Sequence, residues 1–340
     1  MRISVLEQAI AALDRPNQET IANAVDLAVH CEALGYNRFW VSEHHNNQTI
    51  VGTAPEILMA AIASKTETIR VGSAGIMLPH YSAFKVAEQF RVLDSLAPGR
   101  IDLGLGRAPG SDGRTAFALN PLANERPAQF PSDVRDLMAW VTGEPLIDKH
   151  PFATLEAFPK GDTAPEIWIL GSSNYGAQVA AHFGLPYCFA WFFSDGRGAA
   201  EAVEIYRDNF QPSDVCEKPY VGLCVWVFAA DTEEEAQFHY SSRAKWKIFR
   251  ERGLFLPIEP PEVASRQEYD VIERERVERD RATAFIGTAP KVIEQIKRLG
   301  DELEIDEMAL VTWVYNENIR KKSFSLIANA ANLLEVKLGG

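Results

Sequence analysis

The sequence has no apolar run that approaches the roughly 20 residues of a membrane-spanning helix, so we expect neither a membrane span nor a membrane partner. Its first residues, Met1 to Glu7, lack the long apolar core and small-residue cleavage site of a signal peptide. Basic residues are also few, because 34 lysines and arginines stand against 47 acidic residues and give a net charge of −13. Nucleic acid binding needs a basic face, so nucleic acid is not expected as a main partner.

Cysteine is scarce and dispersed. Cys31, Cys188, Cys216 and Cys224 form no CxxC pair, which argues against a zinc ribbon and a dithiol redox centre. Three of the four lie among apolar neighbours, where a free cysteine behaves as a small hydrophobic residue. We therefore expect reduced thiols and a cytoplasmic location.

What the sequence does contain is a regular alternation of apolar runs and helical periods within an ordinary globular composition, 46% hydrophobic and 24% charged. Eight strands are predicted, at 2–6, 39–41, 69–75, 101–105, 167–170, 187–191, 220–228 and 308–314. The predicted helices run from 21 to the C′ glycine Gly35, and over 54–65, 84–96, 174–182, 197–210, 231–250 and 318–336. Thr53 and Glu56 form a predicted capping box. Near-continuous apolar strands of this kind imply burial on both faces, as in parallel sheets covered by helices.

Eight βα units predict an α/β fold, the (βα)₈ TIM barrel, as a single domain over residues 1–340. The alternative, a doubly wound open sheet, needs a glycine-rich turn after the first strand, where Leu6-Glu7-Gln8-Ala9 has no glycine. The long gaps at 106–165 and 230–305 predict insertions after the fourth and seventh strands. Within the second, 251–284 is predicted to be an active-site lid, a solvated helix with pairs such as Glu275–Arg279, or both.

Active sites of such barrels lie at the carboxyl ends of the strands, and Glu43-His44-His45 follows the second strand. Strand geometry puts Glu43 and His45 on one face, so His44 is expected to face the site as a general acid or base and Glu43 to be structural. Buried, hydrogen-bonded histidines are the alternative. No metal is predicted, because too few ligands gather here for a metal ion.

Two further segments predict an anion site. Arg107 follows the fourth strand in Gly104-Leu105-Gly106-Arg107-Ala108-Pro109-Gly110, where an arginine fork suits phosphate and glycines allow close backbone approach. The turn Gly171-Ser172-Ser173-Asn174 lies between the fifth strand and a helix, a place where amides and hydroxyls bind phosphate, although a plain serine N-cap is the alternative. Because the two strands are sequential, one phosphate can contact both segments.

Two sets of apolar residues are candidates for pocket walls. Ser73-Ala74-Gly75-Ile76 has only small side chains near its centre, against which a flat ring can lie, and core packing is the alternative. Trp191 and Trp313 follow the sixth and eighth strands and either wall an apolar pocket or belong to the core.

With these residues assembled, the chain resembles the bacterial luciferase-like family of flavin-dependent monooxygenases, and within it the single-chain bacterial group. The matching stretches are 35–45, 70–79, 87–90 and 98–110. The resemblance is strong over 1–120, weaker to about 195, and in register to the final helix. It implies a (βα)₈ barrel, a homodimer, and FMN in most members or a deazaflavin in others. It also implies a small organic substrate, O₂, and reduced flavin from a separate NAD(P)H-dependent reductase, since no reductase-like motif occurs in this chain.

The resemblance also assigns site residues. His44 matches the family's active-site histidine, proposed as acid or base near the flavin. The Ala74–Gly75 link matches a non-prolyl cis peptide behind the flavin ring. Arg107 and the Ser172-Ser173 turn match the phosphate site.

The sequence departs from the family pattern at the same places. Gly106 stands where the luciferase α-chain has a reactive cysteine, which removes a thiol role and widens the pocket. Ser172 replaces an acidic residue and Gly176 a threonine, so phosphate contacts are expected to rest more on backbone amides around Gly171 and Gly176.

The resulting hypothesis is a monooxygenase that uses reduced FMN and O₂. A deazaflavin-dependent hydride-transfer enzyme and a non-catalytic flavin-binding protein are alternatives in the same fold, and a metal-dependent hydrolase built on Glu43-His44-His45 is a fourth. The substrate is not identified, because its pocket is expected to come from the two insertions, where the resemblance is thinnest.

Overall fold

Eight parallel strands close into a barrel, which confirms the predicted TIM barrel. The computed structural model describes residues 1–108, 110–123 and 125–334. The strands pair in the order β6-β5-β4-β3-β2-β1-β9-β7, and β6 also pairs with β7 to close the barrel. They are β1 (Arg2–Glu7), β2 (Arg38–Val41), β3 (Arg70–Met77), β4 (Ile101–Gly106), β5 (Glu166–Gly171), β6 (Tyr187–Phe189), β7 (Val221–Ala230) and β9 (Glu307–Val311).

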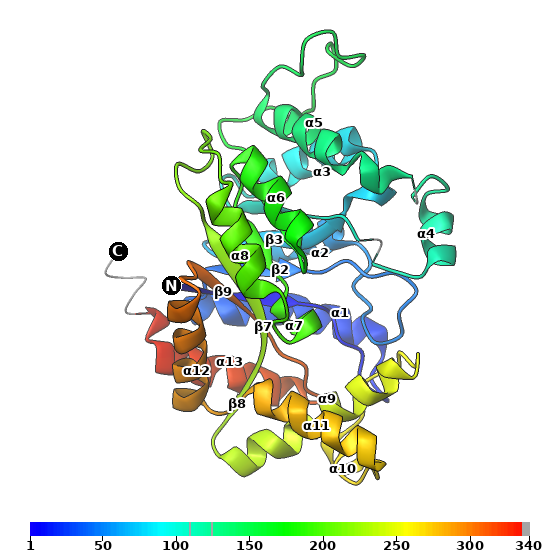
Figure 1. The fold of residues 1–340 in the computed structure, drawn as a ribbon, viewed down its shortest axis with the longest axis vertical. Coiled ribbons are helices and arrows are strands. Elements are labelled where there is room, and N and C mark those ends of the chain that lie inside the picture. Colours follow the sequence, from blue (N-terminus) through cyan, green and yellow to red (C-terminus); the bar gives the residue numbers. More distant parts are fainter. Residues whose placement is uncertain (109, 124, 335–340) are drawn as a thin grey trace.

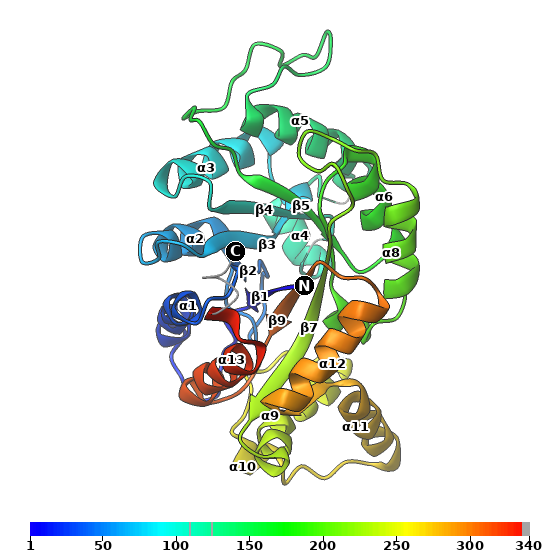
Figure 2. The same cartoon turned by 90° about the vertical axis from the view of Figure 1, so that its left-hand side faces the viewer.

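Helices surround the barrel, as Figure 2 shows for α1, α2, α3, α5, α6, α8, α12 and α13. The helices of the first half are α1 (Asn17–Ala33), α2 (Pro55–Ala63), α3 (Ala83–Leu96), α4 (Gly113–Leu119), α5 (Phe130–Thr142) and α6 (Asn174–Phe183), with short 3₁₀ helices η1 (Leu78–His80) and η2 (Arg126–Ala128). Those of the second half are α7 (Trp191–Ser194), α8 (Ala199–Asp208), α9 (Glu233–Glu251), α10 (Pro261–Ala264), α11 (Val271–Thr283), α12 (Ala289–Glu302) and α13 (Glu317–Ala331). No helix in the described ranges is both long and apolar enough to cross a membrane.

Alternate strand residues serve two cores, which is why the strands are apolar throughout. Val5 and Phe39 pack outward against the helices, whereas their neighbours Leu6 and Trp40 join a second cluster that includes the barrel interior. In β7 every residue is buried. The predicted burial of both sheet faces is therefore confirmed.

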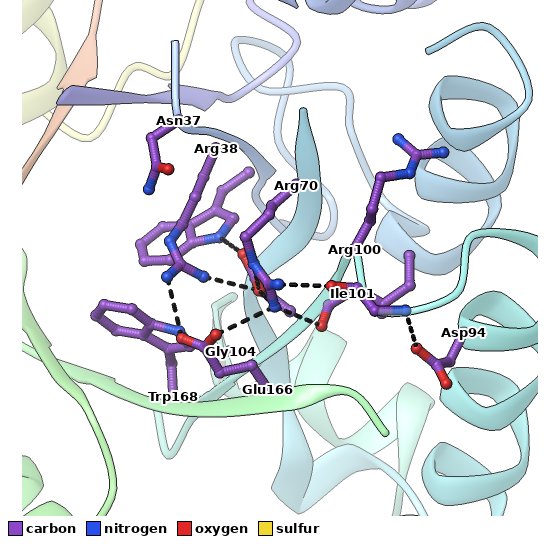
Figure 3. A network of polar contacts seen from close by, with 12 residues as sticks. Asn37, Arg38, Arg70, Asp94, Arg100, Ile101, Gly104, Glu166 and Trp168 are labelled. Atoms are coloured by element: carbon purple, nitrogen blue, oxygen red, sulfur yellow. Dashed lines mark hydrogen bonds and ion pairs between the residues drawn. The ribbon is translucent and has the colours of Figure 1, made fainter. Parts of the chain in front are cut away.

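The amino end of the barrel interior is filled by ion pairs instead of apolar side chains (Figure 3). Arg38 donates from Nη1 to Asp102 at 2.8 Å and from Nε to Glu307 at 3.1 Å. Arg70 donates from Nε to Asp102 at 2.8 Å, and both arginines contact Glu166 at 3.1 Å. This network occupies the end opposite the carboxyl ends of the strands and leaves the latter for a site.

Several predicted boundaries are wrong. The helix after Thr53 begins one residue later than the capping-box prediction requires, because Pro55 takes the first helical position and Ala54, which has no side-chain cap, takes the N-cap. The sixth strand ends at Phe189 and the eighth at Val311, so Trp191 and Trp313 lie beyond strands. Pro109 and the predicted end of the last helix at 335–336 lie outside the described residues.

Insertions do follow the fourth and seventh strands. The first holds α4, η2 and α5. The second holds α10, α11, a strand that sequence analysis missed, β8 (Phe285–Thr288), and the unpredicted helix α12, which packs against α13 and β7. β8 pairs with the last residues of β7, which extends past the barrel.

The charged segment inside 251–284 forms the solvated helix α11, in which only Val277 is buried. It begins with a capping box between Asp270 and Glu273. Two of its ion pairs reach across to α9 and its C-terminal end, from Glu273 to Arg252 and from Arg276 to Glu251. Within the helix the pair is Glu278–Arg281 at 3.0 Å, and not the expected Glu275–Arg279. Figure 1 shows α9, α10 and α11 together at one end of the molecule.

Candidate active site

The residues predicted to be catalytic or to bind the cofactor all line one cavity of about 290 Å³ at the carboxyl ends of the strands, here called the inner cavity. They are His44, Ala74, Gly75, Gly106, Arg107, Gly171, Ser172, Ser173 and Gly176. The strands and loops that carry them are far apart in sequence, and barrel closure brings them together.

One end of the inner cavity is suited to an anion. The Arg107 guanidinium lies over the Tyr175 ring, 3.8 Å from its centroid, beside the first turn of α6. Ser173 occupies the N-cap position, but its side chain makes no capping hydrogen bond, so the interpretation as a plain serine cap is wrong. The amides of the first turn of α6 therefore have no side-chain cap of their own and can receive an anion together with Arg107.

A flat wall of backbone forms another side of the inner cavity. The Ala74–Gly75 peptide bond is cis, as the family resemblance implies. A Cβ on Gly75 would lie 2.7 Å from the carbonyl oxygen of Gly104, and a Cβ on Gly176 would lie 3.3 Å from the Tyr187 ring. Glycine at both positions lets neighbouring segments approach closely and keeps the wall free of side chains.

His44 stands in the cavity wall, while its neighbours are anchored away from it. Glu43 is fully buried and accepts hydrogen bonds from His45 Nε2 at 2.7 Å, the Met77 amide at 2.9 Å and the Tyr81 hydroxyl at 2.5 Å. Burial lowers the pKa of His44 to about 4, although a hydrogen bond with the Gly110 backbone and the charge of Glu43 act in the opposite direction. The imidazole is therefore neutral at pH 7 and able to accept a proton.

The pKa of His44 makes a prediction about acid stability. Its folded pKa of about 4 lies below the ordinary 6.5, so between these values the unfolded chain binds a proton that the folded chain does not. Stability is therefore lost as pH falls from 6.5 towards 4, by at most about 3 kcal/mol from this residue. We expect His44→Gln to flatten the fall in unfolding free energy between pH 7 and pH 4, measured by urea denaturation. A His182→Gln variant, altered at an exposed position, is the control, and an equal slope in wild type and His44→Gln would contradict the assignment.

The thiols near the cavity are not nucleophiles. Cys188 and Cys224 line the inner cavity, and burial raises the pKa of both well above the usual value. At Gly106, where the resemblance implies a lost cysteine, an added Cβ would lie 3.5 Å from Met77 Sδ, which is ordinary contact. The absence of a side chain there enlarges the cavity.

A second cavity of about 730 Å³, here called the aromatic chamber, adjoins the inner one, and both are lined by His44, Gln8, Met77 and Phe192. Trp246 and Trp313 pack edge to face in its wall, with centroids 4.4 Å apart. Each indole is fixed by a hydrogen bond, from Trp246 Nε1 to Thr49 Oγ1 at 2.8 Å and from Trp313 Nε1 to Gln8 Oε1 at 3.0 Å.

Sequence analysis found the polar residues of the site better than its aromatic walls. Trp313 lines the aromatic chamber as expected, but Trp191 lines neither cavity, because β6 ends early and a short helix turns Phe192 and Phe193 inward instead. Trp40 and Tyr175 were missed. The position of Tyr175, two residues after Ser173, was the available signal. Over the residues described, no group of three or more potential ligands could hold a metal ion.

The chain is similar to known proteins over nearly its whole length. A family described as luciferase-like monooxygenase matches residues 1–306. A luciferase-like monooxygenase of Escherichia coli (strain K12) is 36% identical over 91% of this chain and 90% of its own length. An N-acetyl-S-alkylcysteine monooxygenase of Bacillus subtilis (strain 168) is 35% identical over 97% of this chain and 98% of its own.

Solved structures agree with the fold. Apo-MsnO8 is 32% identical and superposes with a TM-score of 0.88 over 98% of both chains. The oxygenating constituent of 3,6-diketocamphane monooxygenase from Pseudomonas putida, in complex with FMN, shares the fold at 19% identity, with a TM-score of 0.72 over 97% of both chains. The cavity at the strand ends and the match along the whole chain lead to the same result: the chain belongs to the luciferase-like monooxygenase family.

Proposed function

We propose that this protein is a flavin-dependent monooxygenase that uses reduced FMN and O₂ to oxidise a small organic substrate. The observation that carries the proposal is the inner cavity, which has an anion site at one end, a flat backbone wall and His44 where it meets the aromatic chamber. A phosphate-bearing ring cofactor and an apolar substrate can therefore meet beside one neutral imidazole.

The residues present fit a flavin. Arg107 and the uncapped first turn of α6 would hold the phosphate, and the Ala74–Gly75 wall would lie against the ring. Reduced FMN, when bound, supplies the electrons that activate O₂ for insertion of an oxygen atom into the substrate. The indoles of Trp246 and Trp313 give the neighbouring chamber an apolar wall.

We propose that the imidazole ring of His44 acts as a general base and then as a general acid. The ring is neutral at pH 7 and lines both cavities, so it can accept a proton from a group that reacts at their junction and return it later. Glu43 is a positioning residue and does not itself transfer the proton. It holds His45, Met77 and Tyr81 and so fixes the backbone on either side of His44.

Relatives support a flavin and leave a second candidate. One structural neighbour is described with FMN, and another, an F420-dependent secondary alcohol dehydrogenase at 16% identity, with an F420–acetone adduct. A deazaflavin-dependent oxidoreductase with the same fold is therefore the second candidate. We also propose that the segment 251–284 closes over the aromatic chamber, because its residues Phe255 and Asp280 line that chamber. We further propose that a separate reductase supplies the reduced flavin and that the chain forms a homodimer.

Anaerobic titration with reduced FMN tests the proposal. We expect tight binding to the wild type and a roughly 10- to 100-fold weaker affinity for Arg107→Ala, equivalent to about 1.4–2.8 kcal/mol, because a fork contact to phosphate is lost. Arg114→Ala is the matched control, since Arg114 is exposed on nearby α4 and lines neither cavity. Mixing the loaded protein with air-saturated buffer then measures the reaction with O₂.

Three other outcomes of this titration would change the proposal. Binding of a deazaflavin without binding of FMN would replace the proposal by the second candidate. Tight binding of reduced FMN without oxygenation of any substrate would favour a flavin-binding protein. An unchanged affinity in Arg107→Ala would remove the phosphate assignment.

A further inference from the structure

The aromatic chamber is lined by a buried cation that, among the residues described, has no carboxylate at ion-pair distance. Arg243, on α9, is 7% exposed and lines the chamber. Within the described ranges, no carboxylate oxygen lies within 4.0 Å of its guanidinium nitrogens. The Trp226 ring lies against it, with its centroid 4.3 Å from the guanidinium carbon, and the Tyr240 side chain is also adjacent.

The carboxylates that line the same chamber are already engaged elsewhere. Lys247 contacts Asp280 at 2.9 Å and Asp195 at 3.2 Å, and Glu251 pairs with Arg276. Asp112 caps α4 through hydrogen bonds from its first-turn amides. Arg243 is therefore left as a buried positive charge that faces the chamber.

Leaving such a charge unpaired is costly, and burial lowers the pKa of Arg243 for this reason. Tyr240, the more distant charges of Asp195 and Asp280, and the Trp226 ring offset only part of the loss. A guanidinium presents a planar fork that matches a carboxylate, so an anionic group entering the chamber would recover the missing interaction.

We propose that Arg243 binds the carboxylate of the organic substrate, so that the substrate is an amphipathic monocarboxylate with an apolar portion reaching towards His44. The indoles of Trp246 and Trp313 contact that apolar portion. A doubly charged group such as phosphate is disfavoured, because Asp195 and Asp280 lie near enough to repel it. This substrate class rests on the proposed function, since it takes the aromatic chamber as the substrate site.

Binding of small probes tests this assignment without flavin or turnover. The probes are benzoate, 3-phenylpropionate, 4-phenylbutyrate and octanoate, each with its uncharged amide, and 3-phenylpropylphosphonate. Affinity for the full-length protein is measured by calorimetry and by quenching of tryptophan fluorescence. We expect at least one carboxylate to bind at least 10-fold more tightly than its amide and more tightly than the phosphonate.

Two variants locate the contact. Arg243→Met removes the charge and keeps an unbranched apolar stem, and we expect it to abolish the preference for carboxylate over amide while affinity for the amide stays within threefold. Arg250→Met is the matched control, because Arg250 also lines the chamber and stands over an indole, that of Trp246, but is exposed. It should retain the preference.

The outcomes separate this inference from the proposed function. If every carboxylate binds no better than its amide, or if Arg243→Met keeps the preference, the inference is wrong, whereas titration with reduced FMN still decides the proposed function. If the phosphonate binds more tightly than the carboxylates, the substrate is not a monocarboxylate. The comparison of acid with amide uses the wild type alone, so it stands even if Arg243→Met fails to fold.

Discussion

We expect Gly104→Ala to destabilise the barrel by about 3 kcal/mol or more, and to abolish binding of reduced FMN in whatever fraction remains folded. A Cβ at residue 104 would lie well inside 3.0 Å of the Ser73 carbonyl oxygen and 2.8 Å from Leu170 Cδ1. The first of these neighbours is backbone of the adjoining strand and cannot move as the end of a side chain can.

Two hydrogen bonds join β3 to β4 at this point. Ser73 Oγ donates to the Gly104 carbonyl oxygen at 3.0 Å and accepts from the Gly104 amide at 3.1 Å. Relieving the clash means separating β3 from β4, and these strands carry the Ala74–Gly75 wall and Arg107. Stability and cofactor binding should therefore fall together.

Gly106→Ala is the matched control, two residues further along the same strand. Its Cβ would make an ordinary contact of 3.5 Å with Met77 Sδ, so we expect unfolding free energy to change by less than about 1 kcal/mol. Urea denaturation followed by circular dichroism measures both variants. Equal effects of the two substitutions would show that the close approach of β3 and β4 does not govern stability.

The glycines illustrate how much of the site could be predicted from the sequence. Gly104 and Gly106 alternate within one apolar strand, and Arg107 follows directly, so both the strand and an anion site at its carboxyl end could be predicted from local pattern. Arg107 and the turn at Ser172-Ser173 follow sequential strands. Parallel pairing of those strands placed them in one cavity.

The aromatic chamber could not be predicted in this way. Trp226, Arg243 and Trp313 come from β7, α9 and the segment after β9, and nothing in their local sequence indicates that they meet. Strand β8 was missed for a related reason, since four residues that pair only with the protruding end of β7 carry little periodicity of their own. Trp191, for which the sequence left a pocket wall and the core as alternatives, packs against the core, because β6 ends two residues earlier than predicted.

The ion-pair network at the amino end of the barrel also lay outside sequence analysis, and it gives the last prediction. Arg38→Met should lower the unfolding free energy at pH 7 by about 3–5 kcal/mol, because Arg38 is 3% exposed and its loss leaves buried Asp102 and Glu307 with too little positive charge. Arg38 also lies over the Trp168 ring, so methionine, which retains an apolar stem, limits the packing loss.

Arg70→Met is the matched control. Arg70 and Arg38 stand opposite each other in register at the starts of neighbouring strands, and both bind Asp102, but the Arg70 side chain is 24% exposed. Water can replace part of the interaction that Arg70 makes with Asp102, so we expect Arg70→Met to lower the unfolding free energy by about 1–2 kcal/mol. A loss in Arg70→Met as large as that in Arg38→Met would show that burial does not set the energy of this network.

A pH series separates lost charge from lost packing. In Arg38→Met, buried carboxylates lose a partner cation, and a proton taken up from solution at lower pH would remove the negative charge that burial penalises. The difference in unfolding free energy between wild type and Arg38→Met should therefore shrink from pH 7 to pH 5. A difference that stays constant over this range would assign the whole effect to packing, because the loss of apolar contacts does not depend on pH.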